Sequence, residues 1–135
     1  MINPSGTLPG RHVLADLHGI DAALLTETDT IEKILMQAAH AAGATPIFSK
    51  FHQFGIGQGV TGVLLLQESH ISIHTWPEHG FAAVDAFMCG TSRPELAIAI
   101  LQQAFQPNHS HIEEVLRGEQ RLFQIAQPLS AMSVS

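Results

Sequence analysis

The stretch TGVLLLQESHISIHTWPEHGFAAVDAFM, residues 61–88, decides the fold. Apolar residues, alone or alternating with polar ones, predict strands at residues 61–67, 70–74 and 81–88. An interruption at Glu68 and Ser69 separates the first two strands, and a turn at residues 75–80 precedes the third. Because strands joined by such short links pair antiparallel, this stretch predicts three neighbouring strands of an antiparallel sheet.

Helices are predicted before and after this stretch. Apolar residues recur every three or four positions between residues 31 and 42, which is typical of one buried helical face. Asp29 and Glu32 resemble a capping box at the start of this helix, and Ser92 and Glu95 resemble one at the start of a second helix. The sequence therefore predicts two helices, of which the first has the more regular apolar face.

Further strands are predicted at residues 12–17, 45–51, 111–116 and 121–125. The order strand, helix, several strands, helix, strands indicates an α+β fold, with a mostly antiparallel sheet and helices on one face. We expect residues 1–135 to form a single domain, because this length is usual for one. The other face of the sheet then needs cover. A homodimer that pairs two such faces would give a helix/sheet/sheet/helix sandwich.

The composition excludes several classes of protein. Six Lys and Arg residues against twelve Asp and Glu residues give a net charge of −6, so the basic surface that nucleic acids require is not expected. No apolar run approaches the length of a membrane span, and residues 1–10 lack the features of a signal peptide. A single cysteine permits no internal disulfide. We expect a cytoplasmic protein with neither a nucleic-acid nor a membrane partner.

Reactive side chains are concentrated in residues 68–80 and 85–90. These segments hold two serines, three histidines, three carboxylates and the only cysteine. On a strand, His70, Ser72 and His74 would point to one face. Their spacing alone favours an ordinary half-buried strand whose polar residues face water, and it identifies no reaction.

Four motifs resemble one known family. They are Gly10-Arg11-His12, Phe51-His52-Gln53-Phe54, the segment from Glu68-Ser69-His70 to Trp76-Pro77-Glu78, and Phe87-Met88-Cys89-Gly90. Together and in this order they resemble the bacterial S-adenosylmethionine decarboxylase proenzymes. The resemblance implies a chain that cuts itself between Glu68 and Ser69 into parts 1–68 and 69–135. It also implies a pyruvoyl cofactor made from Ser69.

The resemblance further implies roles for particular residues. The Ser69 hydroxyl would attack the Glu68 carbonyl, and loss of the Ser69 α-proton would leave a dehydroalanine that hydrolyses to pyruvoyl and ammonia. His74 would assist this processing, since imidazole titrates near neutrality, and Thr61, where the family often has serine, would be a processing aid. Cys89 would protonate the substrate carbon after carbon dioxide leaves. Without the resemblance, His74 fits a structural histidine and Cys89 a small buried residue.

The implied substrate is S-adenosylmethionine, bound to the pyruvoyl group as a Schiff base and decarboxylated to supply the aminopropyl donor for spermidine synthesis. Phe54 and Ile71 would flank the adenine, and Glu78 would accept hydrogen bonds from the ribose hydroxyls. Ordinary core packing explains Phe54 and Ile71 about equally well. His79 replaces an aromatic phenol that is common in the family, close to the ribose contact. A related pyruvoyl decarboxylase acting on an amino acid such as arginine or ornithine is therefore the alternative.

Three other functions fit the sequence less well. His70 and His74 would lie roughly 13 Å apart on a regular strand, too far to share a metal ion, so we expect no metal unless other segments converge. The glycines of residues 55–59 lack the lysine and the following helix of a phosphate loop. A third function is that of an uncleaved, non-enzymatic relative serving as a dimeric partner. The presence of Ser69, His74 and Cys89 argues against it.

Overall fold

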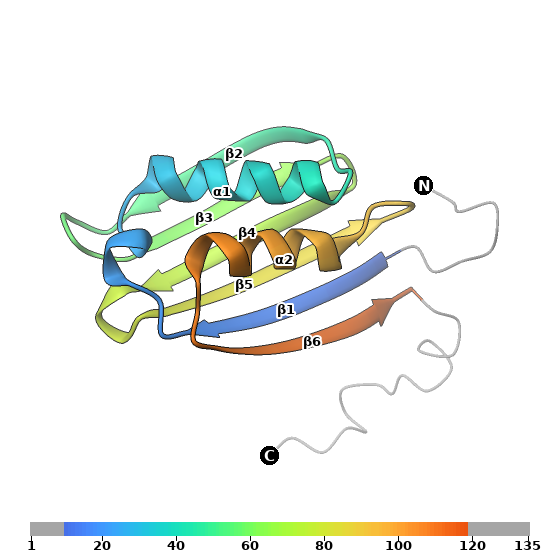
Figure 1. Cartoon of the computed structure of the whole chain (residues 1–135). Helices are drawn as coiled ribbons and strands as arrows, with labels where there is room; N and C mark the ends of the chain where they lie inside the picture. Colours follow the sequence, from blue (N-terminus) through green and yellow to red (C-terminus); the bar gives the residue numbers. More distant parts are fainter. Residues whose placement is uncertain (1–9, 119–135) are drawn as a thin grey trace, which may run out of the picture.

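The computed structural model describes residues 10–118, which form one six-stranded sheet and two α-helices (Figure 1). The strand order is β2-β3-β4-β5-β1-β6, and every neighbouring pair is antiparallel. The strands are β1 (Gly10–His18), β2 (Pro46–Gln53), β3 (Val60–Leu66), β4 (Ser69–Trp76), β5 (Phe81–Cys89) and β6 (His109–Arg117). The helices are α1 (Thr28–Ala41) and α2 (Pro94–Phe105), with the short 3-10 helices η1 (Ala22–Leu25) and η2 (Pro77–His79) in the connections.

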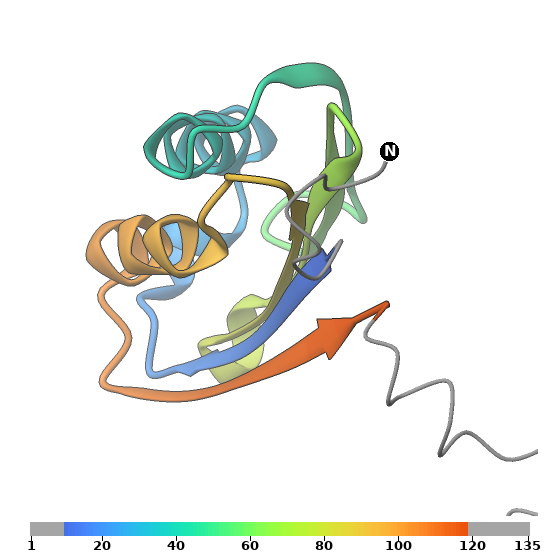
Figure 2. The same ribbon diagram turned by 90° about the vertical axis from the view of Figure 1, so that its right-hand side faces the viewer.

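Both α-helices cover the same face of the sheet and lie side by side (Figures 1 and 2). Between helices and sheet lies a single apolar core, to which strands contribute every second residue because side chains alternate along a strand. Burying each large apolar side chain contributes about 1.5–3 kcal/mol. The fully buried members include Leu17, Ile31, Leu35, Leu64, Ile71, Ile73, Leu101 and Phe105.

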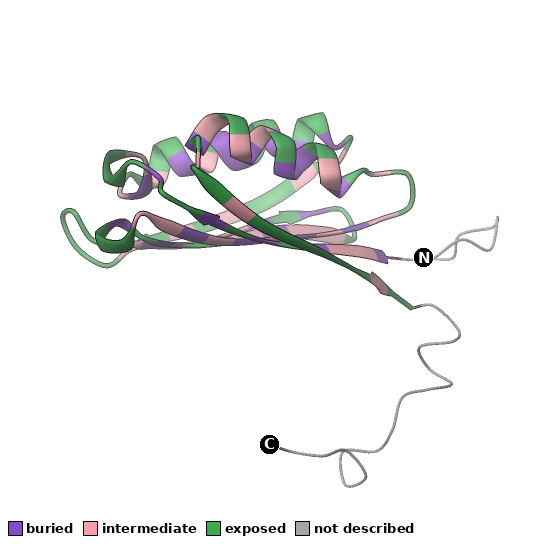
Figure 3. Cartoon of the chain, turned by 60° about the horizontal axis from the view of Figure 1, so that its bottom comes forward, coloured by how far each residue is buried: buried purple, intermediate pink, exposed green. Residues whose placement is uncertain are grey.

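The opposite face of the sheet is left uncovered by the part of the chain that the structure describes (Figure 3). We call it the open face. The strand side chains that do not point into the core point to this face, and most of them are polar or aromatic. On the three central strands they include His12, His70, Ser72, His74, Asp85, Phe87 and Cys89. Most of the residues singled out for their chemistry therefore share one surface.

The predicted fold class is confirmed. Each strand expected between residues 12 and 116 is present, with ends that differ by up to two residues. The segment 121–125 lies outside the described residues. Within residues 10–118, no helix combines the length and apolar character needed to cross a membrane.

Both capping boxes predicted from the sequence are wrong. Helix α1 has Glu27 as its N-cap, so Asp29 lies in its first turn, and α2 has Arg93 as its N-cap, one residue after Ser92. Neither N-cap residue makes a side-chain capping hydrogen bond. Because helix starts are set mainly by packing of the buried face, the local polar pattern misplaced them. A carboxylate in the first turn still interacts favourably with the helix dipole.

Thr75 is the buried polar side chain among the described residues. Its hydroxyl oxygen accepts a hydrogen bond from the Val60 backbone N–H at 2.9 Å and donates one to the Leu25 carbonyl at 2.7 Å. The hydroxyl thus ties the start of β3 and the end of η1 to β4. Both backbone partners would stay buried without it, where an unpaired polar group is costly.

We expect Thr75→Val to lower the free energy of unfolding by about 1–3 kcal/mol, because it keeps the side-chain shape but leaves two backbone groups unpaired. Urea unfolding followed by circular dichroism measures this loss. Thr30→Val, at an exposed position of α1, is the matched control and should change stability by less than about 0.5 kcal/mol. Equal effects of the two substitutions would contradict the structural role of Thr75.

Candidate active site

The turn between β3 and β4 contains the bond at which cleavage is predicted. Leu66 pairs with Ser69, so the turn consists of Gln67 and Glu68. Glu68 has a φ angle of 59°, a left-handed conformation that costs a residue other than glycine about 1–3 kcal/mol. The Glu68–Ser69 bond therefore follows a strained residue, at the interruption that the sequence predicts between the two strands.

Cys89 reaches this turn from the end of β5. His70 of β4 pairs with Phe87 of the antiparallel strand β5, so Cys89, two residues after Phe87, lies near Glu68, two residues before His70. The Cys89 thiol donates a hydrogen bond to the Glu68 carbonyl oxygen, with 3.0 Å between the two heavy atoms. Burial raises the pKa of the Cys89 thiol, although a hydrogen bond with Ser69 acts in the opposite direction. The thiol therefore keeps its proton at neutral pH and polarises the carbonyl next to Ser69.

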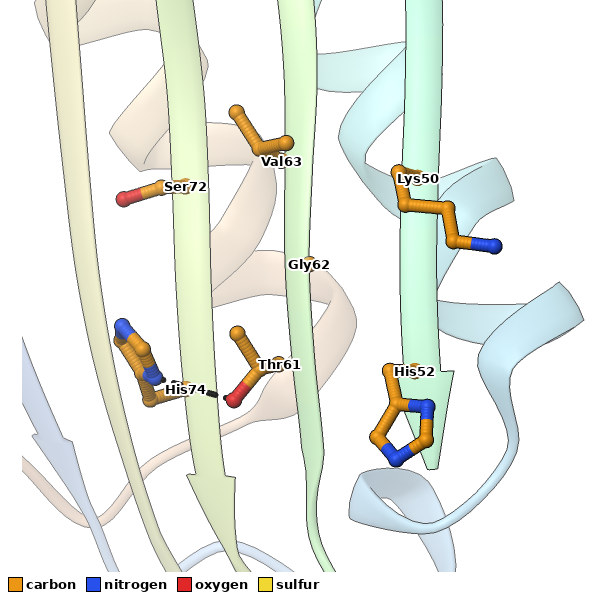
Figure 4. A pocket seen from close by; sticks show the side chains of 7 residues that line it. All are labelled: Lys50, His52, Thr61, Gly62, Val63, Ser72 and His74. Carbon is orange, nitrogen blue, oxygen red and sulfur yellow. Dashed lines mark hydrogen bonds between the residues drawn. The ribbon is translucent and has the colours of Figure 1, made fainter. Parts of the chain in front are cut away.

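Thr61 and His74 form a second group at the other end of β4. They pair across β3 and β4, and the Thr61 hydroxyl lies 3.1 Å from Nδ1 of His74 (Figure 4). His74 lies five positions along the strand from Ser69, a distance of roughly 16 Å. Within one chain the structure thus brings Ser69 together with Cys89, and Thr61 together with His74, but it keeps the two groups apart.

A hollow of about 340 Å³ adjoins the second group, and its lining includes Phe54, Thr61, His74, Trp76 and Glu78. This volume is within the range of small-molecule sites. A neighbouring hollow of about 320 Å³ on the open face shares Thr61 and His74 and extends to Lys50 and His52 (Figure 4). Two of the three residues predicted to hold a substrate, Phe54 and Glu78, therefore lie together near the end of β4 that is away from Ser69.

Ile71 is not part of this hollow. It was predicted to flank the adenine with Phe54, but its side chain is fully buried on the helix side of β4. Phe54, in contrast, is 64% exposed beside the hollow. Strand alternation is the reason, because Ile71 points to the face opposite His70. In the single chain Ile71 is therefore a core residue, and its contact with the adenine stays a prediction.

The sequence interpretation missed a hydrogen-bonded cluster centred on Asp85. One Asp85 carboxylate oxygen lies 2.6 Å from Nε2 of His12 and 2.9 Å from Nε2 of His70, and the other accepts a hydrogen bond from the Ser72 hydroxyl. Burial alone would raise the pKa of Asp85, but the three hydrogen bonds hold it well below its usual value. The bond to Asp85 raises the pKa of His70. Asp85 is therefore ionised and favours a protonated His70.

The ligand atoms of His12, His70 and Asp85 lie within 4.8 Å of one another, close enough to hold a metal ion. The tautomer of His12 argues for a hydrogen-bonded cluster instead. Nη1 of Arg117 lies 3.1 Å from Nδ1 of His12. Because a guanidinium group only donates, Nδ1 accepts and the ring proton is on Nε2, which faces Asp85. That nitrogen then has no lone pair for a metal.

No signal in the sequence connects the members of this cluster. They lie on three strands, and the alternation of polar residues predicts only the face on which each one lies. Their contact depends on the register of β4 and β1 against β5, which a single sequence does not reveal. From the sequence, the only partner for His70 in a possible metal site is His74, which lies on the same strand.

Known proteins show what the chain is similar to. The family model described as S-adenosylmethionine decarboxylase matches residues 11–118. Among curated proteins, the S-adenosylmethionine decarboxylase proenzyme of Acetivibrio thermocellus is 47% identical over 110 residues, covering 81% of this chain and 88% of the relative. The proenzyme of Fervidobacterium nodosum is 44% identical over 111 residues, covering 82% of this chain and 80% of the relative.

A solved structure extends the likeness to three dimensions. The crystal structure of the adenosylmethionine decarboxylase from Aquifex aeolicus matches with a TM-score of 0.78 and 39% sequence identity, covering 84% of this chain and 94% of that one. The matched region includes the strained turn, the thiol that contacts it and the hollow beside His74. The chain therefore belongs to the S-adenosylmethionine decarboxylase family, as the four sequence motifs predicted.

Proposed function

We propose that this chain is a self-cleaving S-adenosylmethionine decarboxylase, a carboxy-lyase whose pyruvoyl group is made from Ser69. The product would be the aminopropyl donor for spermidine synthesis. The observation that carries the proposal is the 3.0 Å contact from the Cys89 thiol to the Glu68 carbonyl at the strained turn. Cleavage at this turn would divide a single domain into chains 1–68 and 69–135.

The contacts at the turn support the first step of the proposed cleavage. The Ser69 hydroxyl attacks the Glu68 carbonyl carbon while the Cys89 thiol stabilises the charge that develops on the carbonyl oxygen. The amide becomes an ester, and Glu68 is relieved of its strained conformation when the ester later breaks. A base removes the Ser69 α-proton, the Glu68 carboxylate leaves, and hydrolysis of the remaining dehydroalanine releases ammonia.

His74 is the base that we propose for this proton, and a second copy of the chain is needed to supply it. His74 and Thr61 lie roughly 16 Å from Ser69 of the same chain, out of reach for proton transfer. His74 and Cys89 lie on the same open face, near opposite ends of β4. A two-fold axis near the middle of β4 would bring the partner's His74 to Ser69 and, equally, His74 to the partner's Ser69.

The open face has the apolar content expected of such an interface. Four large apolar side chains on it are between 38% and 44% exposed in the single chain: Leu14, Leu65, Trp76 and Val115. They lie among histidines and aromatic rings, and Trp76 stacks on Phe81 at 5.2 Å between ring centroids. A homodimer that pairs two open faces would bury these side chains and complete two identical sites.

The hollow beside His74 supports S-adenosylmethionine as the substrate. Glu78 offers a carboxylate to the ribose hydroxyls, and Phe54 and Trp76 offer aromatic faces to the adenine or the sulfonium cation. The pyruvoyl carbonyl would bind the substrate amine and withdraw electrons as carbon dioxide leaves. Cys89, still protonated and beside Ser69, would return a proton to the substrate carbon.

The first prediction is that intact-mass analysis of purified protein finds two chains, 1–68 and 69–135. Both lysines, Lys33 and Lys50, belong to the first chain. The second chain, with a pyruvoyl start, would therefore carry no amine, and once the Cys89 thiol is blocked by alkylation it should take up no acetyl group from acetic anhydride. Ser69→Ala should stay intact because no hydroxyl remains to attack. A second chain that accepts one acetyl group would indicate ordinary proteolysis and contradict the proposal.

The second prediction concerns the dimer and uses two inactive chains with different tags, Ser69→Ala and His74→Ala. Each should stay uncleaved alone. In the mixed dimer, Ser69 of the His74→Ala chain meets the partner's His74, so this chain alone should be cleaved. Mass spectrometry of the isolated mixed dimer reads the result. A mixed dimer that stays intact, or a protein that is monomeric by light scattering, would contradict the shared site.

The third prediction concerns the substrate. Glu78→Ala should lower kcat/KM for S-adenosylmethionine about 10- to 100-fold, the usual loss for hydrogen bonds to a charged group. Glu78→Gln, which keeps one acceptor oxygen, should lose less. Carbon dioxide release is compared for S-adenosylmethionine, arginine and ornithine with fully cleaved enzyme. Release from arginine or ornithine alone, with no effect of Glu78→Ala, would favour the amino-acid decarboxylase.

A further inference from the structure

Cleavage would change how the first residue of β4 is held in place. In the intact chain Ser69 is held on one side by the turn and on the other by the strand. After cleavage Ser69 becomes the free end of a strand that lies between β3 and β5. Ser69 pairs with Leu66 of β3, but the pairing of β4 with β5 begins only at His70. Chain ends fray unless contacts hold them, and this end would carry the reacting group.

His70, the neighbour of Ser69, has the side-chain contact that would prevent fraying. Its Nε2 lies 2.9 Å from the Asp85 carboxylate, which lies on the adjacent strand β5. Asp85 is itself fixed from two further sides, by His12 of β1 and by Ser72 of β4. The contact therefore connects the end of β4 to a carboxylate that has little freedom to move.

We propose that Asp85, acting through His70, anchors the new end of β4 after cleavage and so keeps the group made from Ser69 beside Cys89. This inference rests on the proposed function and assigns Asp85, His70, His12 and Ser72 as positioning residues. None of them needs to touch the substrate. These residues would instead fix the position of the reacting carbonyl. A displacement of a reacting group by about 1 Å can lower the rate about 100-fold.

The charges in the cluster suit an anchor. Asp85 stays ionised, and its charge favours protonation of His70, so the contact is a charge-assisted hydrogen bond between partly buried side chains. Such bonds are about twice as strong as neutral ones. Arg117 fixes the tautomer in which His12 donates to Asp85. The cluster is thus held together by hydrogen bonds whose donors and acceptors all match.

The proposed anchor predicts an effect that a general contribution to stability does not predict. Before cleavage, the covalent turn already holds Ser69, so the loss of the contact should have little effect at the start of β4. After cleavage, the contact is the main restraint on this end besides backbone pairing. The effect of removing it should therefore appear only in the cleaved protein.

Hydrogen exchange of residues 69–76 in Asp85→Asn tests this difference. Uncleaved protein is obtained by adding Ser69→Ala. In cleaved enzyme, Asp85→Asn should lower amide protection at the start of β4 about tenfold, the loss expected for one charged hydrogen bond. In the Ser69→Ala background the same change should have less than about a twofold effect. Asp29→Asn, the same change at an exposed position of α1, is the control and should alter neither form.

Kinetics give the second readout. Cleaved Asp85→Asn should show a lower kcat for S-adenosylmethionine with nearly unchanged KM, because the anchor positions the reacting group without binding the substrate. His70→Ala removes the same contact but keeps the hydrogen bonds of Asp85 to His12 and Ser72. This variant replaces Asp85→Asn in both experiments if Asp85→Asn does not fold. His70→Gln, whose amide can still donate to Asp85, should restore part of the protection and of kcat.

Several outcomes would overturn the anchor. One is equal loss of protection in cleaved and uncleaved forms, which would indicate general destabilisation. Another is a folded Asp85→Asn that does not cleave, which would place its role before cleavage. Wild-type protection and kcat in Asp85→Asn would also reject the anchor but leave the proposed function standing. Failure of the wild-type chain to cleave would instead overturn both.

Discussion

The position of every candidate residue depends on the register of β4 between β3 and β5. The register that pairs His70 with Phe87 brings Cys89 to the Glu68 carbonyl and Asp85 to Ser72. Because side chains alternate along a strand, a slip of β4 by one residue would turn its open-face side chains, His70, Ser72 and His74, toward the helix layer and away from their partners on β5. The apolar side chains on the other face prevent such a slip, since Ile71 and Ile73 would then leave the core. The core thus determines the geometry of the site.

The two faces of the sheet have different roles. The side that packs against the helices stabilises the fold, and the open face carries the reactive side chains. The helix side is apolar and contains Thr75 as its buried polar exception, whose hydroxyl is bonded twice. The open face holds partly buried thiol, carboxylate and imidazole groups, and their surroundings set their charge. The Cys89 thiol is kept protonated by burial, whereas Asp85 is kept ionised by hydrogen bonds. One surface therefore offers both a proton donor and a fixed negative charge.

The sequence predicted the strands and the fold class because alternation and turn residues are local signals. It failed at the helix starts, where packing outweighs the pattern around Asp29 and Ser92. The four motifs indicate Ser69, His74 and Cys89 as candidate site residues, but no spacing rule predicts that Cys89 meets Glu68 while His74 lies far along the strand. The Asp85 cluster was missed for the same reason, since strand register is a property of the whole sheet. Ile71 shows that a residue's face must also be considered before a role is assigned.

The two groups of candidate residues lie at opposite ends of β4, so the proposed site would need residues from a second chain. The strained turn and Cys89 lie at one end, whereas Thr61, His74 and the hollow lie at the other. A second copy related by two-fold symmetry, as proposed, would bring the two groups together without any change within the chain. The open face would then be both the dimer interface and the place where substrate binds.

The most direct test of the central claim is to trap the substrate on the group made from Ser69. Enzyme is incubated with S-adenosylmethionine and sodium cyanoborohydride, and the two chains are separated and weighed by mass spectrometry. The account predicts a substrate-derived mass increase on chain 69–135 alone, although this chain contains no lysine. A mass increase on chain 1–68, which holds Lys33 and Lys50, or on neither chain, would contradict it.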